Sequence, residues 1–254
     1  MLPWIMLNRR QPSELRQVMR LAALLAASLA VAASAQTNVQ RRVSQAAPVT
    51  LTPAAAAVVA RFDAETAGPR HKFSGLSSDG GVAASLATRV EIDQALRKAL
   101  PDLSSSGLSD DDRKAVNIAI WRRIAQIDAE NTTYLKSVLP ADGWFRNSRD
   151  GEQVARDAWL IVQHSPDQAF QREVVTRMAS LLTSGEVNGP DYALLYDRTE
   201  MFAGRRQRYG SQLECRNGRW MPARLDDPAN VDKRRASVGL GPIAQYMEQF
   251  RARC

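Results

Sequence analysis

The sequence holds few of the residues that build familiar catalytic and metal sites. Two histidines and two cysteines occur among 254 residues, with no H-x-x-x-H and no C-x-x-C spacing. These absences exclude the usual zinc sites, so we expect no metal and no other cofactor. The phosphate loop G-x-x-x-x-G-K, the dinucleotide pattern G-x-G-x-x-G and the hydrolase pattern G-x-S-x-G are absent as well. Nothing in the sequence ties a nucleophilic serine or cysteine to His164, so a hydrolytic triad is unsupported.

Cysteine is scarce enough to allow one pairing at most. Cys215 and Cys254 are the two cysteines, and an exported protein reaches a compartment that permits disulfides. A bridge between them would close a loop of about 40 residues and stabilise the fold by ~3–4 kcal/mol in the chain-entropy model. Two free thiols are the alternative, because Cys254 stands at the end of the sequence.

Long apolar runs are also rare, and the one clear example lies near the N-terminus. Residues 21–31 are apolar, four arginines precede them, and Ala33-Ser34-Ala35 follows. This pattern predicts a secretory signal peptide over residues 1–35, cleaved after Ala35. The apolar stretch is shorter than the ~20 residues of an ordinary membrane span, so we expect no membrane span after cleavage. An uncleaved anchor is the alternative. The expected location is secreted or periplasmic.

The charge of the chain is only weakly one-sided. Since the leader holds four arginines and Glu14, cleavage would lower the formal net charge from +7 to about +4. A small positive excess on an exported protein argues against nucleic acid as a partner. A small ligand or an envelope component is the expected partner, and a solvated basic surface is the alternative.

The segment 36–81 is rich in Ala, Ser, Pro and Gly and shows no sustained apolar period. It is therefore predicted to be a disordered tail, with one short helix allowed within 53–65. His71 falls in this tail, where a solvated side chain is expected.

Residues 82–254 are predicted to form a mainly α-helical domain with one small β-hairpin, at about 207–222. The hairpin prediction rests on alternating polarity around Asn217-Gly218, with Cys215 facing Trp220. Ser165, Pro166 and Gln168 predict a capped start for the helix that follows His164. The expected helices span about 82–101, 109–139, 151–164, 166–183, 190–203, 230–238 and 242 onward.

His164 is the first candidate site residue. It ends one predicted helix just before the next begins, where carbonyls attract a cation and free N–H groups favour an anion. A histidine in such a place can serve as a general acid or base. The alternative is that it only caps the helix that it ends.

Gln171 lies on the apolar stripe of the next predicted helix, with Val174, Val175 and Met178. A buried amide needs hydrogen-bond partners, and lacking them costs ~1–3 kcal/mol. His164, Gln163 or a tyrosine could supply them. The sequence thus indicates a buried polar cluster that either stabilises the fold or lines a pocket.

Other polar residues interrupt apolar surroundings. Asp197-Arg198 lies within "LLYDRTEMF", where an internal ion pair or two exposed charges are the alternatives to a binding role. Arg235 could bind an anion, and a solvated charge run is the favoured alternative.

Three polar residues of the predicted hairpin complete the candidate set. Gln207 and Tyr209 share its inner face with Leu213. Gln212 falls on the opposite face, unless Gly210 forms a bulge that re-aims it.

Four short patterns recur together in a known family. They are "QH" at 163–164, "DR" at 197–198, "QRYGSQ" at 207–212 and "RRASVGL" at 234–240. In this order the chain resembles a bacterial domain-of-unknown-function family, from about Gly143 to Tyr246, with Ser211 where a threonine is expected. The resemblance implies one structural module in that region and carries over no activity.

Three functions stay open on the sequence alone. The chain could be an exported binding module with a Gln/His/Tyr-lined pocket for a small ligand or partner. It could be an envelope-acting enzyme that uses His164 as acid or base, with Arg198 or Arg235 holding an anionic substrate. It could also be a purely structural domain whose polar residues bond each other.

Overall fold

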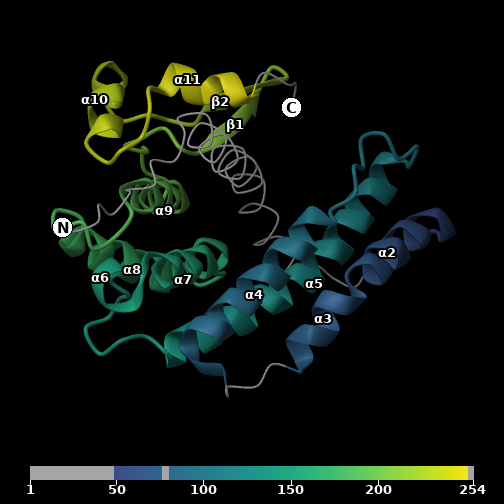
Figure 1. Ribbon diagram of the computed structural model, residues 1–254. Coiled ribbons are helices and arrows are strands. Elements are labelled where there is room, and N and C mark those ends of the chain that lie inside the picture. The colour runs from purple at the N-terminus through teal and green to yellow at the C-terminus, as the bar shows by residue number, and fades with distance from the viewer. Residues whose placement is uncertain (1–48, 76–79, 251–254) are drawn as a thin grey trace, which may run out of the picture.

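The computed structural model describes residues 49–75 and 80–250. The predicted leader, residues 36–48 of the predicted tail, and Cys254 lie outside the described residues. The fold is mainly α-helical and carries one two-stranded antiparallel hairpin, as the sequence predicted (Figure 1).

Two long helices lie side by side through the molecule (Figure 1). They are α4, Gly81–Lys98, and α5, Asp110–Ser137. The predicted start of α5 is confirmed, because the Ser109 hydroxyl accepts a hydrogen bond from the Asp112 amide at 3.1 Å. The acidic residues of its first turn favour the positive end of the helix dipole.

Two further helices lie in the segment that was interpreted as a disordered tail. They are α2, Pro53–Glu65, which lies where one short helix was allowed, and α3, Ala67–Ser74, which was not predicted and corrects the interpretation of that stretch. Ala55, Val59 and Phe62 are spaced by four and three residues, and all three are buried. The alanine-rich composition that suggested a tail also favours helix, and this short stripe is enough to dock α2 against α5.

Helix α7, Glu152–His164, is the central helix of the second half of the chain. It contacts α4 and α5 as well as α8 and α9. Before it comes the short α6, Asn147–Asp150, which the sequence analysis missed. Helices α8, Gln168–Leu181, and α9, Gly189–Phe202, follow. Buried apolar side chains of α7 to α9, with Leu86 of α4 and Leu135 of α5, belong to one large core cluster, and most of the other buried apolar side chains of α2 to α5 form another.

The predicted cap of α8 was wrong by two residues. The helix begins at Gln168, and Asp167, not Ser165, is its cap. The Asp167 carboxylate accepts a hydrogen bond from the Phe170 amide at 3.0 Å and also pairs with Lys136 at 2.6 Å. A carboxylate is a stronger cap than a hydroxyl when a second helix supplies its counter-charge.

The hairpin joins β1, Leu213–Arg216, to β2, Arg219–Pro222. Its register, Cys215 opposite Trp220, confirms the prediction. The turn residues Asn217 and Gly218 both have positive φ, 52° and 73°, as a two-residue hairpin turn requires. The C-terminal elements that follow are η2 (Pro228–Asn230), α10 (Val231–Ala236), α11 (Ile243–Met247) and η3 (Glu248–Phe250).

The hairpin packs differently from the prediction. Leu213 and Tyr209 are buried as expected, but Cys215 is exposed and Trp220 is only half-buried. The ladder is shorter than the predicted 207–222 because Gln207 instead forms an isolated parallel bridge with Leu225.

Candidate functional site

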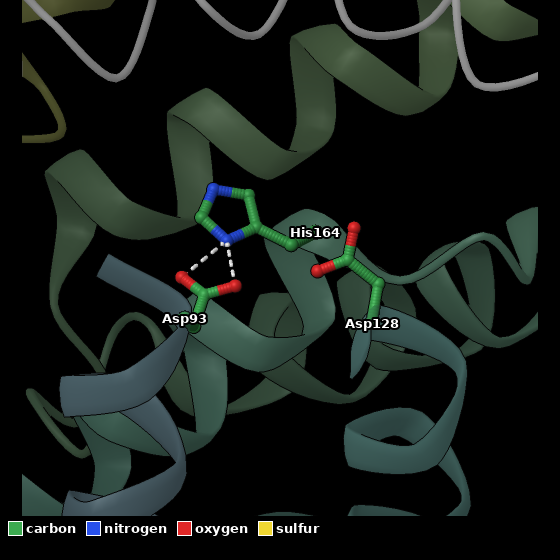
Figure 2. Close-up of side chains that lie close together, drawn as sticks. All are labelled: Asp93, Asp128 and His164. Carbon is green, nitrogen blue, oxygen red and sulfur yellow. Dashed lines mark hydrogen bonds and ion pairs between the residues drawn. The ribbon is translucent and has the colours of Figure 1, made fainter. Parts of the chain in front are cut away.

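A buried hydrogen-bonded pair, His164 and Asp93, joins α7 to α4. The Nδ1 atom of His164 lies 2.9 Å and 3.0 Å from the two carboxylate oxygens of Asp93, as Figure 2 shows. Both side chains are 2 % exposed. Asp93 therefore fixes the orientation of the imidazole at the C-terminal end of α7.

Arg97 links this pair to α5. It contacts the Asp93 carboxylate one turn earlier on α4, and its Nη2 donates to both oxygens of Asp128 at 2.9 Å and 3.0 Å. We call Asp93, Arg97, Asp128 and His164 the charge cluster. It ties three helices together at the boundary between the two apolar cores, since Ile127 belongs to one core and Leu135 to the other.

The protonation of the charge cluster follows from burial and from its neighbours. Burial, then the positive Arg97, lowers the pKa of His164 to about 4, although Asp93 opposes this. Burial would raise the pKa of Asp93, but Arg97 and then His164 outweigh it and lower that pKa to about 2. Near neutral pH the ring is neutral and the Asp93 carboxylate is ionised. Nδ1 must then carry the proton that it donates to Asp93, and Nε2 is the basic nitrogen.

Asp128 is the proton-binding member near neutral pH. Burial raises the pKa of Asp128 to about 7 against the opposing charge of Arg97, and the negative Asp93 adds to the increase. The cluster can therefore gain or lose one proton at Asp128 while Asp93 stays charged.

Asp93, Asp128 and His164 have the donor types of a metal site. One donor atom of each lies within 4.8 Å of the others. Arg97, however, already brings a positive charge to both carboxylates, and that charge opposes a cation. The geometry is that of an ion-pair network more than of a metal centre.

A second polar group lies beside His164. The backbone oxygen of Gln163 accepts from Arg198 Nη1 at 2.5 Å and from Gln171 Nε2 at 3.4 Å, so the guanidinium and the amide lie side by side. The amide also donates to the Val162 oxygen at 2.9 Å. We call Gln163, Gln171 and Arg198 the Arg198 cluster. The predicted burial of Gln171 is confirmed, and its partners are backbone oxygens rather than His164.

The Arg198 cluster contains several buried polar atoms without a hydrogen-bond partner among the described residues. They are Nε and Nη2 of Arg198, both amide atoms of Gln163, and Oε1 of Gln171. Burial lowers the pKa of Arg198 to about 9, and the positive Arg97 adds to this effect. Arg198 is nevertheless charged at neutral pH. It is therefore a buried cation with two N–H-bearing nitrogens, Nε and Nη2, that have no hydrogen-bond partner among the described residues.

The neighbouring Asp197 points to a different group. Its carboxylate accepts from the backbone amides of Arg208, Tyr209 and Ser211 at 2.7, 3.0 and 2.9 Å. Neither alternative to a binding role holds among the described residues: both charges are buried, and the two side chains bond to different segments rather than to each other. Asp197 acts as a template for the loop before the hairpin.

Two glutamines complete that loop. Gln207 Nε2 donates to the backbone oxygens of Gln212 and Ala223 at 2.9 and 2.8 Å, and its Oε1 accepts from the Gln212 amide. Gln212 itself is buried, at 2 % exposed. Gly210 has φ +70°, and this bend re-aims Gln212 inward, which was the stated alternative to its outward placement.

Arg235 belongs to the same loop. Its Nη1 donates to the Tyr209 oxygen at 2.7 Å, and its Nε donates to the Gly241 oxygen at 2.6 Å. It is buried rather than solvated, and these donors are already used. Gln207, Tyr209, Gln212 and Arg235 therefore hold this loop together. They take no part in the hydrogen bonds by which Gln171 and Arg198 share the Gln163 oxygen.

Asp93, Arg97 and Asp128 were not predicted as site residues from the sequence. A signal existed, because Asp93 lies seven residues after Leu86 and three before Leu96, on the apolar stripe of α4. Asp128 lies four residues after Ile124 and seven before Leu135, on the apolar stripe of α5. The reasoning that singled out Gln171 would also have singled out both carboxylates.

Cys215 takes part in a disulfide. The sequence contains one other cysteine, Cys254, which lies outside the described residues. The pairing of these two stays a prediction.

One comparison with known proteins identifies the family of the chain. A model of a family of unknown function, DUF6624, matches residues 82–252. The chain belongs to this family. The match is wider than the resemblance from Gly143 to Tyr246 had implied, because the family includes α4 and α5, which supply Asp93, Arg97 and Asp128 to the charge cluster. No curated protein and no solved structure matches the chain.

Among the described residues, none of the helices is both long enough and apolar enough to cross a membrane.

Proposed function

We propose that the chain is an exported binding protein and that the Arg198 cluster holds a small oxyanion, a carboxylate or phosphate group. The unpartnered Nε and Nη2 of Arg198 carry this proposal. An isolated buried cation is costly, and a guanidinium edge is suited to two parallel hydrogen bonds from an oxyanion. The Gln163 amide is a second buried group that lacks a partner.

The charges around Arg198 support an anionic ligand. Arg97 and Arg198 are positive and Asp93 is negative, while the pKa of Asp128 is raised to about 7. When Asp128 is protonated, the charge cluster and Arg198 together carry one positive charge in excess. A single negative charge at Arg198 would balance it.

Binding is better supported than acid–base catalysis at His164. Its lowered pKa, about 4, makes the ring a weak base at neutral pH, whereas an efficient general base has a pKa near the working pH. A purely structural domain predicts a different result from the binding proposal when Arg198 is removed. If the role is structural, stability should fall. If Arg198 binds an oxyanion, stability without the oxyanion should rise.

Thermal unfolding in the presence and absence of sodium phosphate and sodium acetate, at constant ionic strength, tests the proposal. Arg198→Met keeps the side-chain length and removes the charge. Without oxyanion this variant should melt higher than the wild type, because it removes an unpaired buried charge. Phosphate or acetate should raise the Tm of the wild type and leave that of the variant unchanged. At a hundredfold excess over Kd, the free energy of unfolding of the wild type should increase by about 2.7 kcal/mol.

Arg172→Met is the matched control, since Arg172 is an exposed arginine of α8, and it should respond like the wild type. An Arg198→Met variant that melts lower, with no effect of oxyanions on either protein, would support the structural reading. An equal response of both proteins would place the anion elsewhere. Arg198→Lys, which keeps the charge without the planar fork, should retain weaker binding.

Export is the other half of the proposal, and it rests on the arginine-rich, apolar and Ala33-Ser34-Ala35 segments of the sequence. Intact-mass measurement on protein secreted or released from the periplasm should give a chain that begins at Gln36. A full-length mass from the same fraction would contradict cleavage after Ala35.

A further inference from the structure

A separate cavity of about 400 Å³ lies between α3, α4 and α5. This volume falls within the range of small-molecule sites. Six of its lining residues matter for recognition: Arg70, Phe73, Arg89, Arg123, Ile127 and Glu130.

Three guanidinium groups face this cavity with one carboxylate, that of Glu130. Asp63 holds two of them in place. Its carboxylate lies 2.6 Å from Arg123 Nε, 2.9 Å from Arg123 Nη2 and 3.1 Å from Arg70 Nη2. Even with Asp63 counted, the wall carries one positive charge in excess. Arg70 and Arg123 are each about a third exposed, so solvent reaches the cavity wall.

Arg89 is the most constrained of the three arginines. Its guanidinium carbon lies 4.0 Å from the centre of the Tyr134 ring and 5.1 Å from that of Phe73, an arrangement that favours a cation. Nη1 donates to Asn131 Oδ1 at 3.1 Å. Its Nε is buried without a hydrogen-bond partner among the described residues. The group is thus held in one orientation with a donor unused, which reduces the entropic cost of binding.

Apolar side chains form the rest of the wall. Phe73 and Ile127 are largely buried, at 9 % and 7 % exposed. We infer that this cavity is a second ligand site, for a small organic anion whose carboxylate meets Arg89 and whose apolar part lies against Phe73 and Ile127. Arg70 and Phe73 precede residues 82–252, the region that the family model matches. The site therefore combines two helices of the matched region with a helix that precedes it.

Fluorobenzoate, followed by fluorine NMR on the purified protein, is a suitable probe. The wild type should bind it, and Arg89→Met should weaken binding by roughly tenfold or more. Glu130→Gln removes the one lining carboxylate, so it should tighten binding severalfold. Because Glu130 is exposed, this variant keeps the inference testable should Arg89→Met fail to fold.

Two controls separate this site from others. Arg61→Met changes an exposed arginine of α2 and should leave binding unchanged. Fluorobenzoate carries a carboxylate, which the Arg198 cluster is also proposed to hold, so the titration is repeated in Arg198→Met. Binding that depends on Arg89 should persist in that variant, so failure of this inference and failure of the proposed function are distinguishable. Equal binding of neutral fluorotoluene would overturn the anion selectivity. Wild-type affinity in both Arg89→Met and Glu130→Gln, or no binding by the wild type, would overturn the site.

Discussion

The imidazole of His164 and the carboxylate of Asp93 are hydrogen-bonded although they lie 71 residues apart in the sequence. The contact joins the end of α7 to the middle of α4, so the two halves of the helical assembly meet at a polar pair. Arg97 and Asp128 extend that pair to α5.

This pair predicts an acid-dependent loss of stability. The pKa of His164 is about 4 in the fold and 6.5 as its ordinary value, so between these values the unfolded chain takes up a proton that the folded chain refuses. Stability is lost as the pH falls through this window, by about 3 kcal/mol in total. Urea unfolding of wild type and His164→Gln should show the cost of the substitution shrinking by about that amount between pH ~7 and pH ~4. A cost that is independent of pH would contradict the lowered pKa.

Removing Arg97 should be far more damaging than removing a surface arginine. Arg97→Met leaves Asp93 and Asp128 buried without their shared cation, which typically costs ~3–5 kcal/mol. The exposed Arg61, paired only with Glu65, is the comparison, and Arg61→Met should leave the unfolding midpoint unchanged. Similar midpoints for the two variants would mean that the charge cluster contributes nothing to stability.

Asp197→Asn should loosen the loop before the hairpin. The substitution turns one acceptor oxygen into a donor that faces backbone amides, at a cost of ~1–3 kcal/mol. Hydrogen exchange of the Tyr209 and Ser211 amides should accelerate, while Asp226→Asn, at an exposed position, should leave it unchanged. Unaltered exchange in Asp197→Asn would show that the carboxylate is not the template for this loop.

Helix α2 should behave as part of the folded domain. Phe62→Ala opens a cavity at a side chain that is 2 % exposed and should cost ~3–5 kcal/mol. Val82→Ala, at a position that is 38 % exposed, should change stability by less than ~0.5 kcal/mol. If the two substitutions were equally neutral, the original interpretation of this segment as a tail would be restored.

Local patterns in the sequence were enough for most of the helices and for the hairpin. Asn217-Gly218 determines a two-residue turn, and that turn sets the whole register. The buried glutamine Gln171 was equally predictable, because its position on an apolar stripe depends only on helical spacing. A helix within 53–65 was allowed but was not expected to pack on the domain, and α3 was missed, because the apolar stripe is short and composition dominated the interpretation.

The pairing of polar residues could not be predicted in the same way. Asp93 and Asp128 were recognisable as polar interruptions of apolar stripes. That they would meet His164 depends on how α4, α5 and α7 pack, which no local pattern encodes. Asp197 and Arg198 point in different directions because they are adjacent on one helix. Their hydrogen-bond partners, however, come from distant segments, and a local pattern does not predict them.

The two long helices have a consequence for how the protein melts. Leu86 of α4 and Leu135 of α5 belong to one apolar cluster, whereas Leu96 and Ile120 of the same helices belong to the other. If either apolar core unfolded, α4 and α5 would lose contacts along part of their length, and both helices also contribute buried residues to the other core. We therefore expect α2 and α3, which precede the matched region, to unfold together with it as one cooperative unit, so that a destabilising substitution in one lowers the stability of the other.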